Sequence, residues 1–385
     1  MALSITTNPT LNGKYSARLP IPFRATSGDD WILATVRNSD GTSAGLSTAR
    51  IPKVSGGFTF NPAAYARDLF DPFDLTKVEA DSFSDLGDDM YRLLEVLVQE
   101  EDSPAATTSN HFYVTPGASP IIDTGGTRET ARWHWTQLGI FAASPFTQSA
   151  SYWRFDREWT YNSHLRAVFY AGSGIVSTIS IVYDGSTIVS IAAPGNEGIY
   201  QLPLNDTWVN ANASLGSVPA SWSTARLIVT YSSLGESRQM EIVRDNRCAK
   251  TLIYRNRYGA WDTFVLHGRE EESVEGSAAG LATVRTDVLD TYDAGLGSEF
   301  ADGRVKAYGT RSEVSKSIES DVIRPSVAAY LFRDIVESPV HLIVEEDATG
   351  GEAIREIIID RGASTVSDLG RGRSFTLNYS YATQG

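Results

Sequence analysis

Short runs of alternating apolar and polar residues recur along the chain, separated by turn residues at intervals of about ten positions. Alternation places every second side chain on one face of a strand, and regularly spaced strands of this kind are typical of β-sandwiches. The clearest hairpin covers 177–192, where Asp184 and Gly185 separate two alternating runs, because glycine accepts the positive φ of a tight hairpin turn. Further hairpins are predicted over 226–243 and 251–267. The pattern therefore predicts a mainly β protein with a central antiparallel sandwich domain over residues 106–270.

The residues before this sandwich also have the pattern of strands. Residues 31–36 and 57–60 are short β candidates, and the apolar run 90–99 is ambiguous between strand and helix. Strand is favoured for 90–99 because acidic turn residues flank it on both sides. The small polar stretch 103–110 contains a proline and suggests a boundary. We therefore expect a separate β-sandwich-like domain over residues 1–105.

The remaining residues, 271–385, are expected to form a loop-rich C-terminal β unit with one short helix. The helix is predicted over 324–336, because Pro325 suits the first helical turn and apolar residues recur on one face. Strands are predicted over 340–344, 355–359 and 374–381. The stretch 270–320 is rich in Gly, Ser, Asp and Glu, so we expect long loops with short strands there.

Composition narrows the class of protein. The 385 residues carry 33 Lys and Arg against 47 Asp and Glu, a formal charge of −14, and 42% are hydrophobic, enough for a substantial core. The acidic balance argues against sequence-specific nucleic-acid binding, which requires clustered basic residues. Because Cys248 is the only cysteine, an internal disulfide and a Cys-rich zinc site are excluded. We expect neither a secretory signal nor a membrane contact, because no basic-then-apolar leader and no long apolar run is present.

No catalytic constellation is recognisable. The five histidines (His111, His134, His164, His267 and His341) lack metal-ligand spacing, and Ser173, although it lies between glycines, lacks the strand and helix of a nucleophile elbow. Cys248 is interpreted as a small packing residue. We therefore predict that the chain is not an enzyme, with no catalytic residue, no cofactor and no bound metal.

Two binding alternatives stay open. Aspartates crowd residues 68–89, and a calcium site there competes with a solvated acidic loop, although the ordered Asp-x-Asp-x-Asp-Gly pattern is absent. Tryptophans also gather between residues 133 and 222, where sugar stacking competes with core or interface packing. These tryptophans are Trp133, Trp135, Trp153, Trp159, Trp208 and Trp222.

The hairpin 251–268 carries a resemblance to a known class of protein. Its Tyr-Arg-Asn-Arg-Tyr-Gly-Ala-Trp-Asp-Thr-Phe-Val-Leu-His-Gly (residues 254–268) resembles the aromatic–x–Asn–Arg–aromatic–Gly–Gly–x–Asp–x–Phe–x–Phe–x–Gly hairpin of structural proteins in tailed phages and prophages of Bacteroidetes-type bacteria. The opening residues 8–23, the predicted C-terminal helix and the closing aromatic strand are similar to those proteins as well. The sequence departs from the pattern at Ala260 and Leu266.

The resemblance implies a virion component of the tail, neck or baseplate that forms rings by self-assembly. Its implied partners are copies of itself and other virion proteins, and its implied location is the virion, assembled in the bacterial cytoplasm. In the hairpin, Gly259 would supply the turn, Tyr258 and Trp261 would pack across it, and Asn256 and Asp262 would cap loop amides. We therefore interpret these five residues as a structural assembly hairpin. The alternatives are a carbohydrate-binding β-sandwich module and a tail-associated receptor-binding protein or depolymerase.

Overall fold

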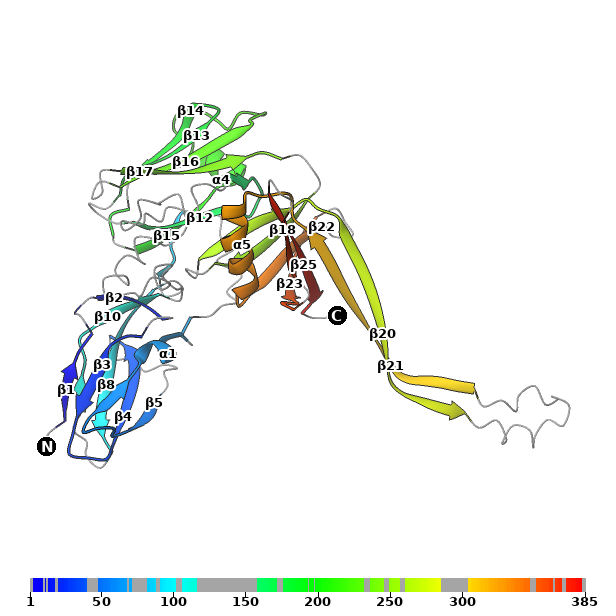
Figure 1. Cartoon of the computed structure of the whole chain (residues 1–385). Helices are drawn as coiled ribbons and strands as arrows, with labels where there is room; N and C mark the ends of the chain where they lie inside the picture. The colour runs from blue at the N-terminus through cyan, green and yellow to red at the C-terminus, as the bar shows by residue number, and fades with distance from the viewer. Residues whose placement is uncertain are drawn as a thin grey trace, which may run out of the picture.

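The structure is a computed structural model of the chain. It describes residues 3–9, 11, 13–17, 20–39, 48–67, 69–70, 82–87, 91–101, 106–115, 158–171, 176–192, 194–196, 198–231, 236–245, 249–256, 260–284, 304–346, 351–362, 364–368 and 372–382. The protein is mainly β, with antiparallel sheets that form two sandwiches and a third, larger sheet (Figure 1). The fold class predicted from the sequence is confirmed.

The first sandwich is built around strands whose alternate residues are buried. In β4 (Trp31–Asn38), Ile32, Ala34 and Val36 point inward, and the residues between them are partly exposed or exposed. One sheet has the order β1-β3-β6 and the other β2-β10-β8-β4-β5, with β9 added beside β8. This arrangement of a three-stranded sheet against a sheet extended at one edge is that of an immunoglobulin-type sandwich. The remaining elements are β1 (Ser4–Thr7), β2 (Gly13–Ser16), β3 (Phe23–Thr26), β5 (Thr48–Pro52), β6 (Phe58–Phe60), α1 (Pro62–Arg67), β8 (Arg92–Glu100), β9 (Ala106–Thr108) and β10 (Phe112–Thr115).

The first sandwich continues past the expected boundary at residue 105. Strand β10 pairs with β8 in antiparallel and with β2 in parallel orientation, and β9 also pairs with β8. The small polar stretch that suggested a boundary is therefore a connection between neighbouring strands of one sheet. The ambiguous run 90–99 forms β8, in agreement with the strand assignment.

The central sandwich packs a five-stranded sheet, β11-β17-β16-β13-β14, against a three-stranded sheet, β12-β15-β7. Asp184 and Gly185 form the turn between β13 and β14 with φ of 43° and 88°, as the hairpin prediction requires. The Asn205 side chain caps α4 by accepting a hydrogen bond from the Trp208 amide at 2.8 Å. The elements are β11 (Glu158–Thr160), β12 (Arg166–Ala171), β13 (Val176–Tyr183), β14 (Ser186–Ala192), β15 (Gly198–Pro203), α4 (Asp206–Asn212), β16 (Thr224–Tyr231) and β17 (Glu236–Val243).

A short segment of the first domain completes the central sandwich. Strand β7 (Ser84–Asp85), which precedes β8 in sequence, pairs with the edge of β15. Phe83 stacks on Phe169 with ring centroids 6.4 Å apart, and the Leu86 amide donates to the Ile199 carbonyl at 2.8 Å. The two sandwiches are therefore joined by an inserted strand as well as by the chain that connects them.

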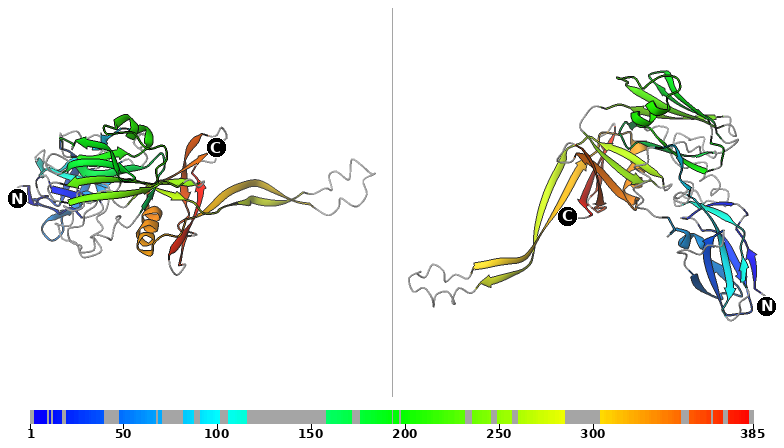
Figure 2. Two further views of the ribbon diagram at one scale, coloured as in Figure 1. Left: turned by 90° about the horizontal axis from the view of Figure 1, so that it is seen from above. Right: turned by 180° about the vertical axis from the view of Figure 1, so that it is seen from behind.

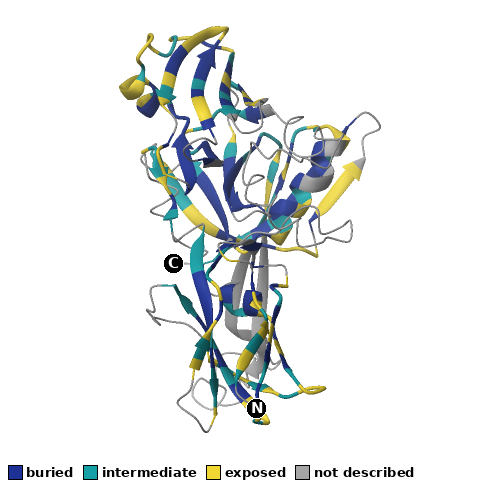
Figure 3. Cartoon of the chain, turned by 90° about the vertical axis from the view of Figure 1, so that its left-hand side faces the viewer, coloured by how far each residue is buried: buried dark blue, intermediate teal, exposed yellow. Residues whose placement is uncertain are grey.

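The C-terminal unit is one sheet with the order β19-β18-β22-β23-β25-β21-β20, and β24 pairs with β25. Helix α5 (Pro325–Glu337) covers one face and buries Val327, Leu331 and Ile335, with Pro325 in its first turn as predicted. Buried and exposed residues are mapped in Figure 3. The strands are β18 (Lys250–Arg255), β19 (Trp261–Leu266), β20 (Glu270–Val284), β21 (Arg304–Glu319), β22 (His341–Glu346), β23 (Glu352–Ile359), β24 (Thr365–Asp368) and β25 (Arg373–Tyr381).

Two expectations about this region need correction. The hairpin 251–267 forms β18 and β19 and joins β22, so it belongs to the C-terminal sheet and not to the central sandwich. The described parts of 270–320 are not mainly loops, because β20 and β21 are 15 and 16 residues long. The C-terminal unit therefore begins near Lys250 and includes a long hairpin that leaves the sheet (Figures 1 and 2).

Candidate functional site

The described residues of the predicted assembly hairpin are buried in the fold. Asn256, Trp261 and Asp262 are 2%, 6% and 4% exposed, and Tyr258 and Gly259 lie outside the described residues. The Asn256 amide donates to the Ala260 carbonyl at 2.9 Å, which closes the hairpin. These three side chains have almost no accessible surface, so they offer little to a neighbouring copy.

Asp262 instead holds the central sandwich to the C-terminal sheet. Its carboxylate accepts hydrogen bonds from the Trp159 indole at 3.5 Å, the Tyr254 hydroxyl at 3.3 Å and the Thr263 amide at 2.9 Å. Trp159 is 103 residues away in sequence and is 2% exposed in the core of the central sandwich. A buried carboxylate is stable only when several donors surround it. We call Trp159, Tyr254, Asp262 and Thr263 the joint.

A second feature, the arm, is the part of the β20–β21 hairpin that extends beyond the sheet. Its register pairs Glu270 with Ile318 at the root and Val284 with Arg304 at the far end. Strand β25 pairs with β21 only from Lys316 to Glu319, so, within the described residues, 273–284 and 304–315 pair only with each other. Twelve residues of extended strand reach about 40 Å. Figures 1 and 2 show this ribbon leading away from the rest of the molecule.

The arm's charges are arranged in zones along its length. The root of β20 carries Glu270, Glu271, Glu272 and Glu275. Farther out, 276–284 has no charged residue, and 304–312 has three basic residues and no acidic one. We call these two paired segments, 276–284 and 304–312, the distal ribbon. Its charge of +3 contrasts with −14 for the whole chain.

A network of charged and tyrosine side chains anchors the arm where it leaves the sheet. Lys250 Nζ lies 2.7 Å from carboxylate oxygens of both Glu270 and Glu345, and Lys316 Nζ lies 3.3 Å from Glu270. The hydroxyl of Tyr379 donates to Glu270 at 3.1 Å. The network joins β18, β20, β21, β22 and β25. We call it the root network, and its members are Lys250, Glu270, Lys316, Glu345, Tyr379 and Tyr381.

The electrostatics of the root network favour its ionised form. Burial alone would raise the pKa of Glu270, but the hydrogen bond and charge of Lys250, with those of Lys316, hold this pKa below its ordinary value. Glu345 has a lowered pKa by the same balance, with Lys250 and Tyr381 as donors. The pKa of Tyr379 is raised by burial and by the nearby Glu270 charge. At neutral pH the network therefore consists of charged Lys and Glu with neutral Tyr donors.

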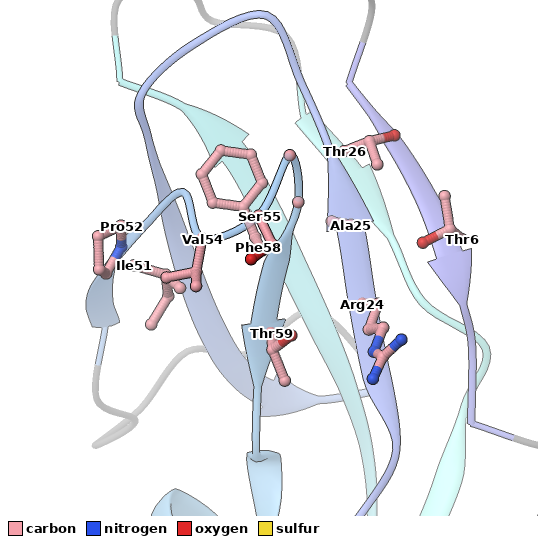
Figure 4. A pocket seen from close by; sticks show the side chains of 12 residues that line it. Thr6, Arg24, Ala25, Thr26, Ile51, Pro52, Val54, Ser55, Phe58 and Thr59 are labelled. Atoms are coloured by element: carbon pink, nitrogen blue, oxygen red, sulfur yellow. The ribbon is translucent and has the colours of Figure 1, made fainter.

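A groove of about 570 Å³ lies on the outer face of the β1-β3-β6 sheet (Figure 4). Arg24 is exposed within it, and the side chains of Thr6, Thr26 and Thr59 lie on the same strands around it. The turn 54–57 forms one wall, with φ of 50° at Ser55 and 82° at Gly56. Within the described residues, the Arg24 guanidinium makes no hydrogen bond or ion pair. The groove can therefore bind a carboxylate together with several hydroxyl groups.

The other candidate residues take structural roles where they are described. His111, His164 and His267 lie 2.9, 3.2 and 3.4 Å from Glu95, Glu352 and Asp245, and His341 contacts the Ile335 carbonyl. Trp159, Trp208 and Trp222 belong to the central core. Outside the described residues lie His134, Ser173, Trp133, Trp135, Trp153, Cys248 and all the aspartates of 68–89 except Asp85.

In the described part of the chain, no group of three or more His, Cys, Asp or Glu side chains is placed to hold a metal ion. The described helices are too short and too polar to cross a bilayer.

The likeness of this chain to known proteins is confined to solved structures with low TM-scores. No protein-family model matches the chain, and no curated protein matches it. Among solved structures, it is similar to the extracellular region of plexin A4 (TM-score 0.22, 8% identity, covering 100% of this chain and 36% of that one) and to the N-terminal four Ig domains of Dscam1 isoform 1.9 (TM-score 0.18, 11% identity, covering 100% and 86%). The chain spans about a third of the plexin region. With TM-scores this low, neither likeness says anything about what the chain does.

Proposed function

We propose that the chain is a structural subunit that assembles with copies of itself through the arm, as a ring-forming component of a phage tail or of the head-to-tail connection. The arm is the observation that carries this proposal. A two-stranded ribbon alone in water is at best marginally stable. In the part of the chain that the structure describes, no third strand lies beside residues 273–284 and 304–315, so both backbone edges are available for pairing with another chain.

The surroundings of the arm support assembly over catalysis. The root network places four charged side chains and two tyrosines where the arm begins, which fixes its direction relative to the sheet. The partly buried titratable side chains described above pair with one another and do not converge on an open cavity. We therefore propose that the chain is not an enzyme and acts by binding other subunits.

The assignment to a virion rests on the resemblance of residues 254–268 to phage structural proteins. On this proposal the partners are further copies of the chain and neighbouring virion proteins, and the location is the virion. The genes adjacent to the coding sequence test this part: a run of tail or portal genes supports it, and their absence argues against it.

The test of self-assembly is a variant that lacks the arm. Residues 274–314 are replaced by Asn-Gly, so that Ser273 and Ser315 are joined by a tight turn. Light scattering coupled to size exclusion should give an oligomer for the full chain and a monomer for the variant, with the same circular dichroism per residue. A full chain that stays monomeric at high concentration, or a shortened variant that assembles equally well, contradicts the proposal.

A second candidate function is carbohydrate binding, and the groove around Arg24 is the observation that favours it. The groove combines threonine hydroxyls, the exposed Arg24 guanidinium, which pairs with no described side chain, and an apolar wall that includes Val54 (66% exposed). These groups match the hydroxyls, carboxylate and C–H face of an acidic sugar. A glycan array should show binding to uronic or sialic acids that is lost in Arg24→Ala. No binding by the full chain rules this function out.

A further inference from the structure

The C-terminal sheet has a second face, opposite α5. Over β18 and β22 this face carries the apolar residues Ile253, Leu342 and Val344, and over β21 and β25 it carries small hydroxyl and amide side chains. Ile318 and Leu377 belong to the core under α5, so Ser317 and Asn378, which pair with each other and follow an alternating pattern, project to the other side. Thr376, paired with Glu319, projects to the same side. Ser317, Thr376 and Asn378 are partly exposed. Because their side chains are small, another strand could approach β21 and β25 on this side.

Acidic side chains lie on or beside this face. Glu271 pairs with Ser317, Glu319 pairs with Thr376, and both glutamates are exposed. Glu356 is also exposed, and it alternates with Ile357 and Ile359 of the α5 core, so it lies on the same side. Arg269, beside Glu271 at 3.2 Å, balances one of these charges. We call Glu271, Ser317, Glu319, Glu356, Thr376 and Asn378 the acidic face.

The distal ribbon has the complementary composition. Segments 276–284 and 304–312 consist mostly of Gly, Ala, Ser, Thr and Val, and their charged residues are Arg304, Lys306 and Arg311. The basic sequence of the distal ribbon is therefore complementary in charge to the glutamates of the acidic face.

We propose that the acidic face of one copy receives the distal ribbon of the next copy. This inference rests on the proposed self-assembly and names the surface that accepts the arm. Figures 1 and 2 show the ribbon leading away from its own sheet, so the receiving face belongs to another molecule. Because the arm and the acidic face are different surfaces, the contact is heterologous and propagates from copy to copy, which closes into a ring or extends as a tube.

The first test is a charge exchange. Lys306→Glu/Arg311→Glu and, separately, Glu319→Lys/Glu356→Lys should each raise the concentration for half-maximal assembly by about tenfold or more. The variant with all four changes should recover most of the wild-type assembly, because opposite charges again face each other. Glu101→Lys/Glu241→Lys is a matched control on exposed residues of the other two domains and should change little.

The outcomes separate this inference from the proposed self-assembly. If the chain lacking 274–314 is monomeric but the Glu319/Glu356 variant assembles as wild type and no rescue occurs, the arm binds another surface and the inference is overturned. If the full chain binds double-stranded DNA through Lys306 and Arg311 while their reversal leaves assembly unchanged, the ribbon is a nucleic-acid contact and the inference also fails.

A cross-link provides a second measurement that does not depend on charge. In a Cys248→Ser background, Ala278→Cys and Ser317→Cys place one thiol on the distal ribbon and one on the acidic face. Oxidation should give disulfide-linked dimers and higher species from the doubly substituted chain, with markedly fewer from either single variant. Linkage that is no greater in the double variant contradicts the proposed contact.

Discussion

The joint and the arm both belong to the C-terminal sheet, but the joint is a buried set of hydrogen bonds and the arm is a pair of strands that extends away from the sheet. At the joint, Asp262 and Trp159 meet across 103 residues of sequence and are almost completely shielded from water. At the arm, two strands continue beyond the sheet, and among the described residues no further strand pairs with them. The contacts of the joint all come from one chain, whereas the arm has backbone edges that no described strand occupies. This difference is why we propose that the arm binds other subunits and that the joint holds two domains of one chain together.

The largest expected effect is at the base of the arm. A Cβ at Gly268 would lie 2.2 Å from the Glu319 carbonyl oxygen, and the Gly268 amide donates to that same carbonyl at 3.0 Å. Because the obstacle is backbone, it cannot move without displacing β21. Gly268→Ala should cost about 3 kcal/mol in the free energy of unfolding. Urea denaturation measures this cost, and Gly195→Ala, where no atom lies within 4 Å of the added Cβ, is the control.

Asp262→Ala tests the joint. The change removes the carboxylate that accepts hydrogen bonds from Trp159 and Tyr254 in a buried site. It should lower the free energy of unfolding by about 2 kcal/mol. Asp262→Asn keeps an acceptor oxygen and should lose less, and exposed Asp30→Ala should lose little. Chemical denaturation measures all three. Equal losses at Asp262 and Asp30 would mean that the joint has no special role.

The root network predicts a pH dependence. The folded-state pKa values of Glu270 and Glu345 are lowered below the ordinary value of 4.5, so the unfolded chain binds more protons at acidic pH. The stabilisation by these two groups is therefore complete above pH 4.5 and is lost as the pH falls below it. Urea denaturation of wild type and of Glu270→Gln/Glu345→Gln at pH 7 and at pH 3 to 4 should show a difference that shrinks at the lower pH. A difference that is independent of pH contradicts this account.

The smallest effect on stability is expected at Arg24. Its exposed guanidinium makes no hydrogen bond or ion pair with the described residues, so Arg24→Ala should change the free energy of unfolding by less than about 0.5 kcal/mol. Thermal denaturation measures the change. A larger loss would show that Arg24 supports the first sandwich, and the groove would then be a weaker candidate for ligand binding.

Sequence patterns predicted the elements that face a core. The Asp184–Gly185 hairpin and α5 lie where alternation and helical spacing placed them, because burial on one side produces those patterns. Strand β8 lies in the ambiguous run 90–99, where the acidic flanking residues favoured a strand. Strands β20 and β21 were missed because the arm has no core to face and includes Gly276, Gly280 and Gly309. Local alternation also does not say which sheet a hairpin joins, so 251–267 was assigned to the wrong domain.

The candidate site was only partly accessible to sequence reasoning. The hairpin around Trp261 and Asp262 was identified, but its burial depends on Trp159, and a contact between residues 103 apart leaves no local signal. The arm had a signal that could have been used: three basic residues without an acidic one in 304–312, beside an uncharged run in 276–284. This zoning is unusual in an acidic chain.

Electron microscopy of the purified full chain tests the central claim most directly. The account predicts closed rings or stacked tubes in which density for the β20–β21 arm crosses from one subunit onto the C-terminal sheet of its neighbour. Separate single subunits with the arm free of any neighbour, at concentrations where light scattering is also monomeric, would contradict it.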